Sequence, residues 1–456
     1  MWLSIVFAPL VEMGAFLRVD QFVFPVMFLV SLFHLRRQET NSRGATLIVG
    51  FSVISMLLSG YGGLVTGELN FQFLLKWPAL FLFNTLACYT VIWWSKDRRD
   101  ILLQRSLRWL QIALFIAGFI GLIQVLEHHG LTRNHAVSYV LNQFYPYYGE
   151  LTDNAHLKSM GMQLRTGGAG RITSVFDGHP ILAGDFLAIG LVLTLPLARG
   201  LSGMLLTAVP TLALMLTLSR GSILAWGAGI VAYMGFLSMR RGSSPRTIRV
   251  VVQIACVVAG LVVVTMFTPF GTSILWRVES TIETIMGTGV EDGRTEKVWP
   301  MVFAALEKSS LSHWLFGLGR MYEGPADSQY LFTMVNAGLA GVFVLLIFHI
   351  QLARMGYRYG MVAQDGQHSE FGFAFAAAIV ALLVMYTVHP ALQNRRLLSA
   401  VFTMAMLIPH IVIRYRTRIS AESSHDRQNR ASHNRSSFRR RSHPAQGVQQ
   451  PVAERV

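Results

Sequence analysis

Three arginines stand where a largely apolar chain could bind an anion. Arg220 lies in TLSRGSILAW, at the junction of two apolar runs, Arg294 lies in GRTEKVW, and Arg171 ends the Gly-rich stretch GGAGR. Arginine suits phosphate because its planar guanidinium donates two parallel hydrogen bonds and stays charged. A charge at membrane depth is costly and therefore points to function, although Arg220 could also mark a tight turn and extend to the interface. Together the three predict a site for a lipid diphosphate.

Asp327, in ADSQYLF, is the carboxylate best placed for chemistry. It directly precedes an apolar run, so it could cap a helix N-terminus by accepting hydrogen bonds from backbone N–H groups. It could also act as a general base toward a sugar hydroxyl, and the two roles are compatible. Asp177 and Asp185 are weaker candidates. Asp185 falls inside a predicted helix, where it needs a partner or a water-filled cavity.

The pattern of histidines, cysteines and glycines predicts neither a metal nor a cofactor. His128 and His129 are adjacent, and the other histidines are scattered without HExxH or a comparable ligand pair. Cys88 and Cys256 both lie in apolar stretches, which is typical of buried helix residues rather than of a disulfide framework. There is no ATP-binding motif, and no strand–helix unit surrounds the Gly-rich stretch.

The composition predicts an all-α polytopic membrane bundle. The chain has 456 residues, of which 52% are hydrophobic and 14% charged. Its apolar runs of roughly 17–25 residues are long enough to cross the bilayer as helices, and they lack the alternation of a β-barrel. About twelve transmembrane helices are expected. We predict them near residues 1–17, 21–34, 44–60, 71–95, 109–127, 180–197, 203–218, 222–238, 250–268, 329–350, 370–388 and 397–413.

Lys and Arg in the short connections predict the orientation. Arg199, the cluster at 240–249, and Arg354 with Arg358 all fall on one face if the helices alternate. The positive-inside rule makes that face cytoplasmic, with both termini inside. Arg395 and Arg396 fall on the other face and count against the placement of the last helix pair.

This topology predicts six regions. Residues 1–127 form the N-terminal transmembrane helices, 128–179 an extracytoplasmic loop, 180–268 the central helices, 269–328 a large extracytoplasmic loop that carries catalysis, 329–413 the C-terminal helices, and 414–456 a disordered basic cytoplasmic tail. The net charge is +15, but no folded basic module accompanies it, so nucleic-acid binding is not expected.

Three stretches together resemble the O-antigen ligase and polymerase superfamily of bacterial membrane enzymes. They are TLSRGSILAW at a helix junction, GRTEKVWPMVFAALEKSSLSHWLFGLG in the large loop, and DSQYLFTMVNAGLAGVFVLLIF leading into the next helix. The similarity covers roughly residues 165–350, and its order and sidedness agree with the topology predicted from charge.

The resemblance implies a metal-independent glycosyltransferase of the bacterial inner (plasma) membrane, using an undecaprenyl-diphosphate-linked glycan donor and a glycan acceptor. Arg220 and Arg294 match the family arginines that engage the donor diphosphate, and Arg171 resembles a further arginine of the polymerase branch. Tyr330 is the aromatic residue that follows the polar pair and is expected to contact substrate. Beyond the lipid bilayer, a flippase and a chain-length regulator are implied as partners.

One departure favours the polymerase branch of the family. The ligase branch has a His–Asn pair where this chain has Asp327–Ser328. We therefore expect a polymerase that joins repeat units into O-antigen, capsule or exopolysaccharide, with Asp327 as base. The alternatives are a ligase that transfers a finished glycan to lipid A core or another acceptor, and a transporter of lipid-linked sugars.

Overall fold

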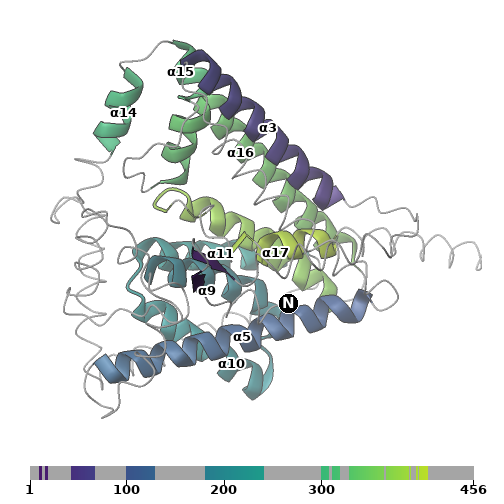
Figure 1. Ribbon diagram of the computed structural model, residues 1–456. Helices are drawn as coiled ribbons and strands as arrows, with labels where there is room; N and C mark the ends of the chain where they lie inside the picture. Colours follow the sequence, from purple (N-terminus) through teal and green to yellow (C-terminus); the bar gives the residue numbers. More distant parts are fainter. Residues whose placement is uncertain are drawn as a thin grey trace, which may run out of the picture. The chain divides into compact units, whose positions relative to one another are not determined.

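A computed structural model describes most of the central and C-terminal helices (Figure 1). The described residues are 10–12, 16–18, 43–66, 99–128, 180–240, 299–307, 311–318, 328–363, 366–389, 391, 397–398 and 400–408. The chain divides into two units, residues 1–409 and 410–456, and all described residues belong to the first. The helices predicted at 21–34, 71–95 and 250–268 and the tail at 414–456 lie outside the described residues.

Helices dominate the described part of the chain, and six of them are long and apolar enough to cross a membrane. This confirms the prediction of a largely α-helical chain with several helices suited to span a membrane. The helices are α3 (Arg43–Thr66), α5 (Arg99–His128), α9 (Pro180–Thr194) with its 3-10 extension η1 (Leu195–Leu197), the shorter α10 (Gly200–Leu216), α11 (Arg220–Ser238), α14 (Trp299–Glu307), α15 (Leu311–Phe316), α16 (Gln329–Val362) and α17 (Gly366–Met385). Residues 397–398 and 400–408 are also helical.

The helix predicted over residues 1–17 is wrong in its second half. Strands β1 (Leu10–Glu12) and β2 (Phe16–Arg18) pair antiparallel there. Their three-residue connection contains Gly14, and a short connection with glycine favours a β-hairpin over a continuing helix.

Helix α9 is the core of the bundle. Nearly all of its residues are buried, and it packs against α5, α10, α11 and α17. A helix that is apolar around most of its circumference is stable only when neighbours surround it. Two glycines allow close packing, because a Cβ on Gly190 would lie 2.8 Å from Leu114 of α5, and one on Gly229 of α11 would lie 2.6 Å from Val192.

The described helices run in the relative directions that the predicted alternation requires. Along two parallel helices, the residue numbers of successive contacts rise together. Along two antiparallel helices, the numbers rise in one helix and fall in the other. Thus α9 runs parallel to α11, α5 runs parallel to α10, and α17 runs opposite to α11. The contacts are Asp185–Ser222 and Val192–Gly229 for the first pair, Gln111–Gly203 and Gly118–Pro210 for the second, and Gly221–His389 and Gly229–Ala381 for the third.

Polar side chains gather at the two ends of this bundle. At one end, which we call the Arg199 end, Arg199 forms an ion pair with Glu370 at the start of α17. There too the Arg240 guanidinium donates to the Ala363 carbonyl at 3.0 Å. Both arginines were predicted to lie in cytoplasmic connections, and in the structure both connections lie at this same end of the bundle. The opposite end, the Arg220 end, contains Asp185, Arg220 and His389.

Helix α16 is broken at Gly338, which has φ 65° and ψ −169°. Ser328 donates to the Tyr386 carbonyl at 3.0 Å, and the Tyr386 hydroxyl lies 2.8 Å from His349 Nε2. A straight helix would separate Ser328 from His349 by about 31 Å, a distance that one tyrosine cannot bridge. Residues 329–337 therefore fold back, and the prediction of a single helix over 329–350 is wrong. Residues 339–362 alone, at about 36 Å, are long enough to cross a bilayer.

The end of α15 packs closely against the break in α16. Gly317 has φ 77°, and a Cβ on it would overlap the backbone of Asn336 and Ala337. A Cβ on Gly338 would overlap the backbone of Leu315 and Phe316. Only glycine permits such an approach at these backbone angles. Part of the segment predicted as a large loop is thus helical and packs against the folded-back residues of α16.

Candidate functional site

A tight, hydrogen-bonded turn places Arg220 at the first position of α11. Helix α10 ends at Leu216, and Leu218 takes φ 52°, a value that non-glycine residues rarely adopt. Thr217 stabilises the turn, because its hydroxyl donates to the Leu214 carbonyl at 2.7 Å and accepts from the Ser219 N–H at 3.3 Å. The tight turn predicted around Arg220 is confirmed, and the Arg220 side chain is half-buried.

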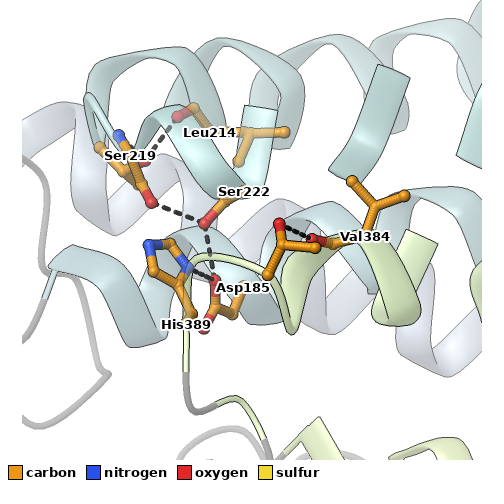
Figure 2. A network of polar contacts seen from close by, with 8 residues as sticks. Asp185, Leu214, Ser219, Ser222, Val384 and His389 are labelled. Carbon is orange, nitrogen blue, oxygen red and sulfur yellow. Dashed lines mark hydrogen bonds and ion pairs between the residues drawn. The ribbon is translucent and has the colours of Figure 1, made fainter. Parts of the chain in front are cut away.

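Around the first turn of α11, four polar side chains form one hydrogen-bonded network (Figure 2). Ser222 Oγ donates to Asp185 Oδ1 at 2.7 Å, and His389 Nδ1 lies 2.8 Å from the same oxygen. Ser219 Oγ is 2.7 Å from Ser222 Oγ, and because the Ser222 proton points to Asp185, Ser219 is the donor. These hydrogen bonds therefore join α9, α11 and the end of α17.

These groups are shielded from solvent. Asp185 is 1% exposed, Ser222 0% and His389 3%. A carboxylate in such surroundings is tolerated only when paired and hydrogen-bonded. The partner that Asp185 was expected to need is thus an imidazole together with a serine hydroxyl.

Two glycines make room for these hydrogen-bonded side chains. A Cβ on Gly184 would lie 2.7 Å from Ser222 Oγ, so any larger residue there would displace the serine. A Cβ on Gly221 would overlap Val388 and lie 2.8 Å from His389 Cε1. Gly221, next to Arg220, therefore lets the His389 ring lie directly against the first turn of α11.

The turn after α17, residues 386–389, also contacts the start of α16. The Tyr386 carbonyl accepts from Ser328 Oγ at 3.0 Å and from the Gln329 N–H at 2.9 Å. Tyr330 donates to the Leu383 carbonyl at 2.9 Å, and its ring meets Tyr386 edge to face. One short turn thus touches the N-termini of both α11 and α16.

The helix cap at the start of α16 is Ser328 and not Asp327. Ser328 is extended, and its hydroxyl accepts from the Leu331 N–H at 3.5 Å. An N-cap is a single residue whose side chain bonds the first turn. The suggestion that Asp327 caps this helix is therefore wrong, and Asp327 precedes the cap.

The structure describes two of the five predicted site residues. Arg220 and Tyr330 both lie at the Arg220 end, beside the turn after α17. Arg171, Arg294 and Asp327 lie outside the described residues. His389 and Ser222 were not assigned by the sequence, since only the fold brings them to Asp185. Among the described residues, no group of three or more His, Cys, Asp or Glu could hold a metal.

No protein-family model and no curated protein sequence matches this chain.

Proposed function

We propose that the chain is a membrane glycosyltransferase that polymerises undecaprenyl-diphosphate-linked oligosaccharide repeat units into O-antigen, capsule or exopolysaccharide. The Arg220 end is its active face, on the extracytoplasmic side of a bacterial inner membrane, and both termini are cytoplasmic. The proposal rests on the sequence pattern around Arg220, Arg294 and Asp327 and on the geometry of this end of the bundle.

The observation that carries the proposal is the turn at 386–389. His389 lies against Gly221, the neighbour of Arg220, and Tyr386 binds Ser328, the neighbour of Asp327. The described neighbours of the position expected to bind the donor diphosphate and of the position expected to activate the acceptor hydroxyl therefore contact one turn. Transfer of a glycosyl group needs these two functions side by side, because the acceptor oxygen attacks the carbon that the diphosphate leaves.

The electrostatics of this end favour an anionic ligand. The N-termini of α9, α11 and α16 all lie at the Arg220 end. Helix N-termini carry partial positive charge and present N–H groups to anions. Arg220 adds a full charge at the start of α11. Arg220 and Arg294 would neutralise the charge that develops on the departing diphosphate, with Arg171 as a further contact, Tyr330 against the saccharide and Asp327 as base.

A lipid-linked sugar transporter is the alternative from another class. The break in α16 favours it, because transporters bind substrates at discontinuous helices. However, the residues expected to act on the substrate, Arg220, Arg294 and Asp327, fall at a helix junction and in a long connection of the sequence, whereas transporters place such residues in broken helices near the middle of the bilayer. A ligase would use the same chemistry on a different acceptor.

The test compares Arg220→Ala and Arg294→Ala with Arg240→Ala, an arginine of the Arg199 end, in a deletion strain. We expect the first two to abolish glycan elongation with normal membrane insertion, because the donor diphosphate loses its guanidinium partners, and the third to elongate normally. The measurement is gel profiling of the glycans. Polymer of normal length from Arg220→Ala or Arg294→Ala would refute the donor site.

The deletion strain also separates the three functions. A lost polymerase leaves single repeat units on the carrier or acceptor, and a lost ligase leaves full-length polymer on the carrier. A lost transporter leaves lipid-linked units on the cytoplasmic side of the membrane.

A further inference from the structure

We propose that His389, held by Asp185, is the acid that protonates the departing diphosphate of the lipid-linked donor. This inference rests on the proposed function and adds a catalytic residue that the sequence pattern did not assign. It starts from the orientation of the His389 ring between α9 and α11.

The two ring nitrogens of His389 face different partners. Nδ1 lies 2.8 Å from Asp185 Oδ1, so it is the nitrogen that donates to the carboxylate. A Cβ on Gly221 would lie 2.8 Å from Cε1 and 3.1 Å from Nε2, so this edge faces the first turn of α11. Among the described residues, the hydrogen bonding of the ring is confined to Nδ1. Nε2 is thus directed to the turn that carries Arg220.

Two charged positions lie close to the His389 ring. Asp185 is the charged group that faces the ring from α9, and Arg220 is the nearest charged position on α11. The Asp185 carboxylate, which also accepts from Ser222, fixes the orientation of the ring. A diphosphate bound by Arg220 would meet the Nε2–H of this ring.

The proton balance of the transfer is then complete. The acceptor oxygen forms a bond to the anomeric carbon and gives its proton to Asp327, while the bond from that carbon to the diphosphate oxygen breaks. The electron pair stays on the diphosphate oxygen, which takes the Nε2 proton of His389. The imidazole becomes neutral with Nδ1–H still on Asp185, and water restores both protonation states before the next turnover.

The same contacts would be present if His389 only held three helices together. The experiment therefore separates a structural role of His389 from a catalytic one. His389→Asn keeps a donor at the position of Nδ1 but removes Nε2. Ser222→Ala also weakens the network, yet leaves the Asp185–His389 pair intact. Both are measured in the full-length protein in lipid nanodiscs, with lipid-linked repeat units extracted from the deletion strain as substrate.

We expect His389→Asn to lower kcat by about 10²–10⁴-fold, the usual contribution of general acid–base catalysis, with little change in the KM for the donor. Ser222→Ala should retain most of the activity.

Two results would overturn the role of His389. The first is a wild-type rate for His389→Asn. The second is that His389→Asn and Ser222→Ala lose the same amount of rate and the same amount of thermal stability. If the wild type forms polymer and Arg220→Ala does not, such a result refutes the His389 inference alone. If the wild type forms no polymer from these units, the proposed function is wrong and the inference falls with it.

Discussion

At the scale of single residues, the Arg220 end depends on small side chains as much as on polar ones. Asp185, Ser222 and His389 can meet only because Gly184 and Gly221 leave the space that their contacts occupy. A methyl group at either position would push a hydrogen-bonding side chain out of reach. The glycine beside Arg220 therefore serves the packing of His389.

Gly221→Ala tests this packing, with Gly227→Ala in the same helix as its control. A Cβ on Gly221 would overlap Val388 and press on His389, whereas nothing lies within 4 Å of a Cβ on Gly227. We expect the first change to cost about 1–3 kcal/mol, as overpacking does, and the second to be neutral or stabilising by up to about 1 kcal/mol. Thermal unfolding in detergent measures both. Equal midpoints for the two variants would contradict the close contact.

At the scale of elements, the break in α16 decides what the start of this helix does. If α16 were straight, Ser328 and Tyr330 would lie far beyond the end of α17. The break returns them to the turn at 386–389, so residues 329–337 belong to the Arg220 end and residues 339–362 cross the bundle. Helix α14 supports the same segment, since Val302 and Leu306 pack with Leu318, Met334 and Val335.

Gly338→Ala should therefore disrupt the Arg220 end, and Gly50→Ala in α3 is the matched control. The φ and ψ values of Gly338 are essentially confined to glycine and cost other residues about 1–3 kcal/mol. The overlap with Leu315 and Phe316 adds to this cost. Nothing lies within 4 Å of a Cβ on Gly50.

We expect faster proteolysis near residues 311–338 and loss of glycan elongation in Gly338→Ala, with neither change in Gly50→Ala. Limited proteolysis in nanodiscs and glycan profiling provide the two measurements. A Gly338→Ala protein with wild-type cleavage and polymer would show that the fold-back is not required.

At the scale of the whole molecule, the polar contacts of the helices separate into two groups. The Arg199 end holds the ion pair with Glu370 and the contact of Arg240 with Ala363. The Arg220 end holds the Asp185–His389 network. Cytoplasmic connections of membrane proteins are enriched in Arg and Lys, so we expect the Arg199 end to face the cytoplasm.

Cysteine labelling tests this sidedness, in a chain whose Cys88 and Cys256 are replaced by Ala. Thr387, at the Arg220 end, is exposed, and Leu201, at the Arg199 end, is 76% exposed. A membrane-impermeant maleimide should label Thr387→Cys in intact spheroplasts and Leu201→Cys only after permeabilisation. The reverse pattern would place the proposed active face in the cytoplasm and rule out polymerisation outside.

The sequence by itself determined the class of the protein and most of its described helices. Apolar length is a local property, so the helices around Asp185 and Arg220 and the tight turn between α10 and α11 were predictable. The alternation of successive spans also predicted the relative helix directions. The hairpin at 10–18 was missed, because a short apolar stretch with a glycine does not distinguish a strand from a helix.

Only the tertiary structure decided which residues meet at the Arg220 end. His389 and Asp185 are 204 positions apart, and no local spacing connects them. The backbone angles of Gly338 depend on the close approach of α15, so the break in α16 could not be predicted from the local sequence. Arg220 could be identified as a candidate site residue from its charge in an apolar setting. The His389 imidazole could not, because only the antiparallel packing of α17 on α11 brings it to this site.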